Sequence, residues 1–203
     1  MSNENPTRIR LDNVRLAGHS LYTPSAFQDN QQVKFSATVL FEKKSKQAKA
    51  IKALLEQVAK DKWGAQSTTI LKQLFAGDKM CLHDGAIKAD KDGYDDTLNY
   101  LNATSKSRPG LFNRTREPVT EADGVIYSGC YVNFIIELWA QDNQYGKRIN
   151  AELKGVQFVG DGERLGGASP ASAEDFPELE DEGGAGDDWN EPETEAATDD
   201  WDS

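Results

Sequence analysis

Apolar and polar residues alternate along several stretches of the chain, which is the pattern of β-strands that have one buried face. The clearest stretch covers residues 130–141, where Cys130, Val132, Phe134, Ile136, Leu138 and Ala140 share one face. The same alternation predicts further strands over residues 7–18, 33–41 and 147–159. In the second of these the inward set is Val33, Phe35, Ala37, Val39 and Phe41.

Two of the predicted strands are interrupted. The apolar phase of the first one shifts at Asp12-Asn13, and Gly155 lies inside the last one. A β-bulge inserts one residue into a strand and bends it, so we expect a bulge at each place. Bending of this kind lets a long strand take part in a small barrel.

A helical period replaces the alternation after Ser45. Apolar residues recur at helical spacing from Ala48 to Val58, which predicts a helix that Ser45 caps and that runs to about Lys62. A shorter helix is expected at about 65–75, ending at Gly77. We interpret the lysines on the polar side as a solvated face: Lys46, Lys49, Lys52 and Lys60.

The segment 80–124 is rich in turn signals, and only short strands are expected there, around 80–82 and 98–104. Residues 142–146 are typical of a hairpin loop. About five strands with inserted helices indicate a mainly β (α+β) fold, of the kind found in a small, partly open OB-fold barrel.

The charge is distributed unevenly. The chain has 203 residues and a net charge of −11, but residues 169–203 hold fourteen Asp or Glu and no Lys or Arg. Residues 1–168 hold the remaining 20 acids against all 23 bases, a net charge of +3. The sequence therefore predicts a mildly basic domain over 1–168 and a disordered acidic tail over 169–203, since the tail has too little apolar surface to order itself.

Enzymatic and metal-binding patterns are poor. Residues 160–166 do not match a dinucleotide-binding glycine motif, so we expect no catalytic residues. His19, His83, Cys81 and Cys130 could supply one zinc site, but Cys130 lies on the core-facing side of its strand, and we expect neither metal nor cofactor. Two cysteines and the lack of a long apolar run predict a soluble, cytoplasmic protein with no membrane contact.

Aromatic and basic residues on polar positions suggest a surface for unpaired nucleic acid. Tyr131 and Trp139 lie on the polar side of the strongest strand, where they could stack on bases; the alternative is that another segment covers them. A loop-rich segment adds Lys106, Arg108, Arg114 and Arg116, with Tyr100 and Phe112 nearby. Lys34 and Arg10 lie on outward positions of their strands and complete the candidate DNA-binding set.

Several blocks of residues between Met80 and Gly167 resemble the phage single-stranded DNA-binding family that was first catalogued as a domain of unknown function. These blocks are residues 81–85, 88–90, 93–94, 103–109, 127–132, 139–143, 155–159 and 161–167. The resemblance implies an OB-fold, binding of single-stranded DNA without sequence preference during phage replication or recombination, and no catalysis.

The acidic tail suggests a role in protein contacts. It contains Asp187-Asp188-Trp189 and Asp199-Asp200-Trp201, followed by Asp202 and Ser203. An aromatic residue among carboxylates is a typical anchor for a partner, here a polymerase, helicase or nuclease. Homo-oligomers remain possible. The alternative function is an acidic DNA mimic or docking factor without DNA binding of its own.

Overall fold

The computed structural model describes residues 6–26 and 32–166. These residues form seven strands and two α-helices, with three short 3-10 helices in the connections. The elements are β1 (Arg8–Ser25), β2 (Lys34–Glu42), α1 (Lys46–Trp63), η1 (Gly64–Gln66), α2 (Ser67–Ala76), β3 (Leu82–Asp84), η2 (Gly85–Lys88), β4 (Leu98–Ser105), β5 (Gly110–Phe112), η3 (Glu121–Asp123), β6 (Tyr131–Asn143) and β7 (Gly146–Gly160).

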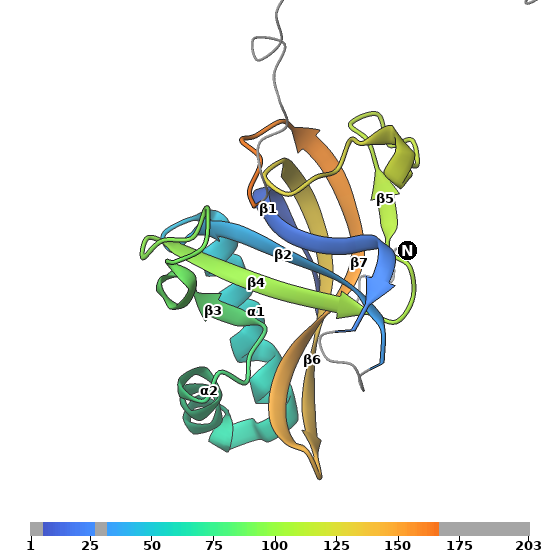
Figure 1. Ribbon diagram of the computed structural model, residues 1–203. Coiled ribbons are helices and arrows are strands. Elements are labelled where there is room, and N and C mark those ends of the chain that lie inside the picture. Colours follow the sequence, from blue (N-terminus) through green and yellow to red (C-terminus); the bar gives the residue numbers. More distant parts are fainter. Residues whose placement is uncertain (1–5, 27–31, 167–203) are drawn as a thin grey trace, which may run out of the picture. The chain divides into compact units, whose positions relative to one another are not determined.

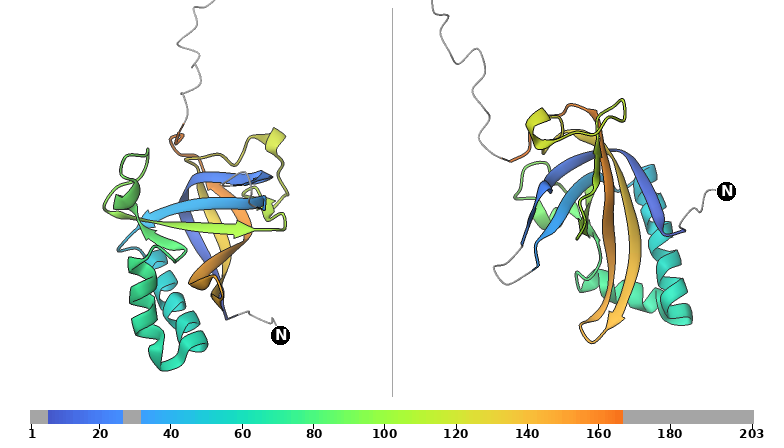
Figure 2. Two further views of the ribbon diagram at one scale, coloured as in Figure 1. Left: turned by 60° about the horizontal axis from the view of Figure 1, so that its bottom comes forward. Right: turned by 90° about the vertical axis from the view of Figure 1, so that its right-hand side faces the viewer.

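Five of the strands form a closed barrel (Figures 1 and 2). β1 pairs with β2 and β6, β2 also pairs with β4, and β6 also pairs with β7. A parallel pairing of β4 with β7, at Thr104 and Glu152, closes the ring. β3 and β5 extend the sheet beyond the barrel, on β4 and β7 respectively. The predicted OB-fold is confirmed, with α1 and α2 inserted between the second and third barrel strands.

β1 is longer than predicted, because it continues to Ser25 instead of ending near Gly18. Its first part pairs with β6 and its second part pairs with β2. The predicted bulge is confirmed by a register shift against β6 between Leu11 and Val14, where Asn13 has a φ of 51°. The bulge lets one strand bend from one side of the barrel to the other.

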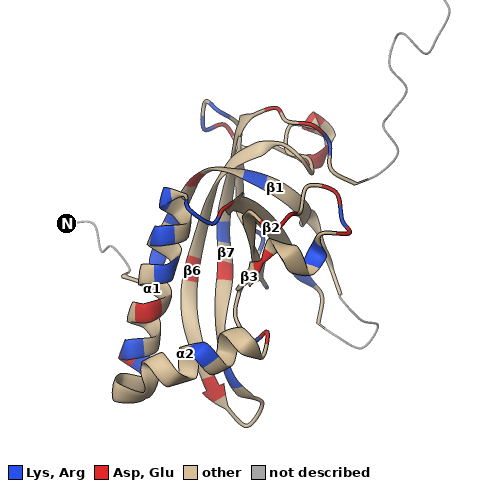
Figure 3. Cartoon of the chain, turned by 90° about the vertical axis from the view of Figure 1, so that its left-hand side faces the viewer, with Lys and Arg blue, Asp and Glu red and all other residues tan. Residues whose placement is uncertain are grey.

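α1 covers part of the barrel and begins as predicted. The Ser45 hydroxyl accepts a hydrogen bond from the Ala48 backbone N–H at 3.1 Å, which caps the helix. Ala48, Ile51 and Leu55 are buried, whereas the lysines are exposed. Figure 3 shows basic residues recurring along α1. The predicted division of this helix into an apolar and a lysine-rich side is therefore confirmed.

β6 and β7 form a long hairpin that supplies much of the core. The inward residues of β6 from Val132 to Leu138 are almost fully buried. The hairpin loop expected over residues 142–146 is shorter than predicted. Asn143 already pairs with Gly146, so only Gln144 and Tyr145 connect the strands. The bulge expected at Gly155 is confirmed, and the unpaired residue is its neighbour Lys154.

Four further expectations need correction. Val33 is 54% exposed and precedes β2 instead of belonging to its inward set. The short strand predicted near Met80 begins at Leu82. The segment 80–124 contains β5, which the turn signals hid. A 3-10 turn over 64–66 precedes α2, so this helix starts at Ser67.

Candidate nucleic-acid interface

The outer face of β6 carries exposed aromatic side chains. Trp139 is 45% exposed and Tyr131 is 36% exposed, and the residues between them on the inner face are buried in the barrel. Among the described residues, no segment covers either side chain completely. They lie eight residues apart on one strand, which corresponds to about 26 Å.

A groove lies beside Trp139, where β4 and β7 close the barrel. It has a volume of about 470 Å³, and we call it the β4–β7 groove. Its lining residues are Lys34, Thr104, Ser105, Lys106, Ser107, Trp139, Gln141, Asn150 and Glu152. The groove thus combines one indole, two ammonium groups, one carboxylate and several neutral hydrogen-bonding side chains, and the indole and the ammonium groups suit a base and its phosphates.

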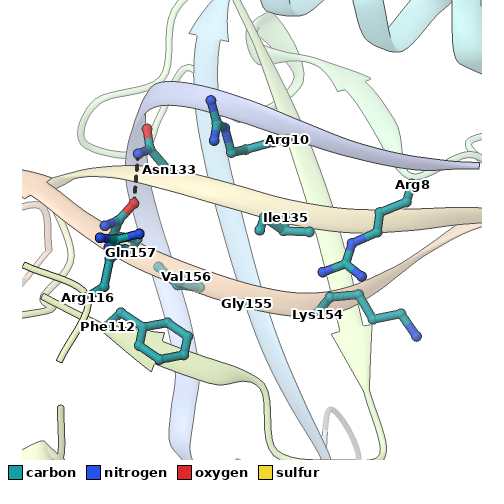
Figure 4. Close-up of a pocket in the computed structure, with 10 residues that line it drawn as sticks. All are labelled: Arg8, Arg10, Phe112, Arg116, Asn133, Ile135, Lys154, Gly155, Val156 and Gln157. Carbon is teal, nitrogen blue, oxygen red and sulfur yellow. Dashed lines mark hydrogen bonds between the residues drawn. The ribbon is translucent and has the colours of Figure 1, made fainter. Parts of the chain in front are cut away.

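A second hollow lies farther along the same outer face, over β1, β6, β7 and β5 (Figure 4). It has a volume of about 340 Å³, and we call it the β5 cleft. Its lining residues are Arg8, Arg10, Phe112, Arg116, Asn133, Ile135, Lys154, Gly155, Val156 and Gln157. The cleft holds four cations and an aromatic ring that is 37% exposed, although Arg10 is paired with Asp12 and Lys154 with Glu152. This lining suits an anionic ligand with a flat group.

The groove and the cleft adjoin at an ion-pair cluster on the outer face. The Lys154 ammonium, which lines the cleft, lies 3.0 Å from the Glu152 carboxylate, which lines the groove. It also lies 3.3 Å from the Glu137 carboxylate on β6. Hydrogen bonds to the two carboxylates, the larger effect coming from Glu152 and the smaller from Glu137, raise the pKa of Lys154. The ammonium therefore stays charged between the two hollows.

Tyr131 lies at the far end of β6 from Trp139 and lines neither hollow. It is paired in register with Arg15 of β1 and Gly160 of β7. A Cβ atom on Gly162 would come within 3.1 Å of the Tyr131 ring, so the chain passes close beside this ring. Arg15 donates a hydrogen bond to the Glu163 carbonyl, which holds this segment against β1.

The structure divides the candidate DNA-binding residues into groups. Lys34, Lys106 and Trp139 line the β4–β7 groove. Arg10, Phe112 and Arg116 line the β5 cleft. Arg108 and Arg114 are exposed on the connections before and after β5 and line neither hollow.

Tyr100 is a correction to the candidate set. Its residue is only 3% exposed, because its ring is stacked on His83 at a centroid distance of 4.6 Å and meets Tyr94 edge-on at 5.5 Å. The Lys88 ammonium lies 4.3 Å from the centre of the same ring. The segment 83–94 thus covers the outer face of β4 at this point, and Tyr100 has no free ring face for a base.

Several lining residues escaped the sequence reasoning. Arg8 precedes Arg10 on the same polar phase, which was an available signal. Lys154 is the bulged residue of β7, and its position depends on a register that sequence alone does not supply. The amides of Asn133 and Gln157 bond to each other across β6 and β7 at 3.0 Å, and uncharged residues of this kind carry little sequence signal.

Other expectations fall outside this surface. The partner-binding residues Trp189, Asp199, Asp200, Trp201 and Asp202, and the whole segment 169–203, lie outside the described residues. Cys81 and Cys130 are both buried with free thiols, and the His83 ring bonds to Asp78 at 2.6 Å. Of the helices in the described part of the chain, none is long and apolar enough to cross a membrane.

Comparison with known proteins identifies the family of this chain. Residues 7–186 match the family described as Enterobacter phage Enc34, ssDNA-binding protein. A protein named p50, from Acyrthosiphon pisum secondary endosymbiont phage 1, is 38% identical over 175 residues, which cover 85% of this chain and 94% of that protein.

Solved structures agree with that match. The single-stranded DNA-binding protein from bacteriophage Enc34 in complex with ssDNA is 30% identical, with a TM-score of 0.67 over 80% of this chain and 91% of that one. The fold is also shared with gp2.5, a single-stranded DNA-binding protein encoded by bacteriophage T7, at 12% identity and a TM-score of 0.52 over 89% of this chain and 98% of that one. The chain described here therefore belongs to the family of the phage Enc34 ssDNA-binding protein.

Proposed function

We propose that this protein binds single-stranded DNA without sequence preference, along the outer face of β6. The observation that carries the proposal is that two adjoining hollows beside this face each combine an exposed aromatic ring with cations: Trp139 with two lysines in the groove, and Phe112 with arginines in the cleft. Stacking on unpaired bases is indifferent to sequence, because every base has a π-face.

The groove and the cleft have different tasks in this proposal. In the β4–β7 groove, Trp139 stacks on a base while Lys34 and Lys106 meet phosphates. In the β5 cleft, Phe112 takes the base, and Arg10 and Arg116 take phosphates. Arg108 and Arg114 add charge along the approach. The Enc34 protein, solved in complex with ssDNA, supports this class of ligand for a member of the same family.

We further propose that the acidic tail regulates binding. Fourteen carboxylates tethered to a domain of net charge +3 reach a high effective concentration near its cations. They compete with DNA phosphates, and binding of DNA releases them. Trp189 and Trp201 then serve as anchors for a polymerase, helicase or nuclease in phage replication or recombination.

The acidic DNA mimic is the function to be distinguished experimentally. A fragment of residues 1–168, which contains every described residue, is titrated with fluorescently labelled oligothymidylate at low salt. A single-strand binder gives saturable binding, and the fragment binds more tightly than the full chain. A DNA mimic gives no binding, either as the fragment or as the full chain. Stoichiometric zinc in the purified protein would instead favour a metal-dependent activity.

A further inference from the structure

The loop that connects β5 to Pro118 has an organised interior although its residues are mostly exposed. Phe112 is bridged to Pro118, and the Val119 N–H bonds to the Leu111 carbonyl at 3.0 Å, so the loop is the tip of a short hairpin. Within this tip, the Asn113 N–H bonds to the Glu117 carbonyl at 2.9 Å and the Arg116 N–H bonds to the Asn113 carbonyl at 3.2 Å. The backbone thus closes on itself around the Asn113 side chain.

The Asn113 amide is the centre of this tip. Its Oδ1 atom accepts hydrogen bonds from the backbone N–H groups of Thr115 and Glu117, both at 2.9 Å. Its Nδ2 atom donates to the Glu117 carboxylate at 2.7 Å. The Thr115 hydroxyl lies 2.8 Å from both Asn113 Oδ1 and Glu117 Oε2, and its single proton serves one of them at a time. One side chain therefore fixes Thr115 and Glu117, the two residues that flank Arg116.

Arg116 has a backbone conformation that arginine rarely adopts. Its φ is 69°, in the left-handed region that costs free energy for residues other than glycine. Such a conformation persists only where the surrounding structure determines it, and here the Asn113 network does so. The result is that the Arg116 side chain lines the β5 cleft beside Gln157 and Phe112 (Figure 4). The Gln157 amide in turn donates to the Asn113 carbonyl at 3.3 Å, which ties the loop to β7.

From this geometry we infer that the loop 113–117 is a preformed phosphate-binding arm, in which Asn113 positions the Arg116 guanidinium for a DNA phosphate in the β5 cleft. The inference rests on the proposed binding of single-stranded DNA. Preforming the backbone of the arm means that less conformational freedom is lost when DNA binds, so the cation contributes more to affinity than an arginine on a mobile loop does. The Glu117 carboxylate is exposed, but hydrogen bonds from the Asn113 amide and the Thr115 hydroxyl hold it within the arm.

Arg114 provides a matched control. It carries the same charge, lies two residues before Arg116 and is exposed, but it does not line the cleft. Asn113 should therefore be coupled to Arg116 and not to Arg114. A merely structural role of Asn113 would weaken binding without distinguishing between the two arginines.

The test is a double-mutant cycle on the full chain, with fluorescence anisotropy of a labelled oligothymidylate at several salt concentrations. Arg116→Ala should reduce the log–log salt slope by about 0.7, so that its affinity deficit shrinks about fivefold for each tenfold rise in salt. Asn113→Ala should weaken binding nearly as much, and the double variant should bind no more weakly than Arg116→Ala alone. Combined with Arg114→Ala, the Asn113→Ala effect should simply multiply.

Independent, multiplying effects of Asn113→Ala and Arg116→Ala would overturn the inference, as would an Arg116→Ala protein with unchanged affinity. If Asn113→Ala does not fold, Thr115→Ala replaces it in the same cycle, because it removes one hydroxyl of the network and leaves the backbone intact. Multiplying effects of Thr115→Ala and Arg116→Ala would then be equally decisive. A wild-type chain that does not bind oligothymidylate at all would instead refute the proposed function itself.

Discussion

Glu152 and Lys154 stand two residues apart on β7, and their charged groups meet at 3.0 Å where the β4–β7 groove adjoins the β5 cleft. Side chains two residues apart on a strand point to the same face, so both groups lie on the outer face of β7, just before the register against β6 shifts. If single-stranded DNA binds as proposed, it passes this pair on the outer face. Its phosphates then compete with the Glu152 carboxylate for the same ammonium group.

This relationship predicts that Glu152→Gln binds single-stranded DNA more tightly than the wild type. The change removes a negative charge from the groove lining and frees Lys154 for a phosphate. The gain should be about 1 kcal/mol, the size of one solvent-screened charge interaction, and should fade as salt rises. Anisotropy titrations measure it. Glu56→Gln on α1 makes the same change of charge away from both hollows and should leave affinity unaltered.

Trp139→Ala and Tyr131→Ala test the stacking. Each should weaken binding of single strands by roughly 1–3 kcal/mol, the usual contribution of one stacked base. Neither should change the melting temperature much, because both rings are substantially exposed. A Trp139→Ala protein that melts early but binds normally would show that the ring stabilises the fold and does not contact DNA.

Tyr100→Ala should destabilise the fold instead of weakening a contact with DNA. The ring is buried against His83 and Tyr94, so its removal should lower the free energy of unfolding by roughly 3–5 kcal/mol, as for other buried aromatic residues. Denaturant unfolding measures the loss. Tyr100→Phe keeps the stacked ring and should retain most of the stability. A drop in the DNA affinity of Tyr100→Phe would show that the Tyr100 hydroxyl contacts DNA and would return this residue to the binding surface.

His83 predicts a dependence of stability on pH. Burial lowers the pKa of His83 below its ordinary value of 6.5, although Asp78 opposes this. The unfolded chain therefore takes up a proton at a higher pH than the folded chain, and stability falls as the pH drops through about 6.5 toward the lower pKa of the folded state. His83→Phe should flatten this part of the profile and keep the contact with Tyr100. His19→Phe should leave the His83 contribution in place, since burial lowers the pKa of His19 separately.

Deletion of residues 169–203 tests the proposed competition by the tail. The truncated chain should bind single-stranded DNA more tightly than the full chain, since fourteen tethered carboxylates are removed. The difference should shrink above about 0.1 M salt, where the Debye length falls below about 10 Å. Equal affinities at every salt concentration would remove the competitor role. Normal recruitment of replication proteins by a Trp201→Ala chain would remove the anchor role.

The sequence predicted those parts of the fold that depend on one strand or helix at a time. The alternation from Cys130 to Ala140 oriented β6, the phase shift at Asp12-Asn13 located a bulge, and Ser45 located a helix start. Each of these features is a local consequence of side-chain period or backbone capping.

What the sequence could not predict depends on contacts between distant segments. Tyr100 lies on β4 at an outward position, but η2 and the residues after it cover that position. The sequence of this covering segment has no regular apolar period, so its contact with β4 could not be predicted. The separation of Lys106 from Arg116 into groove and cleft follows from closure of the barrel between Thr104 and Glu152. The left-handed conformation of Arg116 depends on a side-chain network within its loop.

Binding of single-stranded DNA along β6 is tested most directly by titrating the full chain with mixed-sequence single strands and with duplexes of the same length, over a range of salt. We expect single strands to bind more tightly than duplexes and with nearly equal affinity whatever their sequence. The log–log salt slope should be about −0.7 for each phosphate engaged by the groove and the cleft. Tighter binding to one particular duplex sequence than to mixed single strands would contradict the stacking surface proposed here.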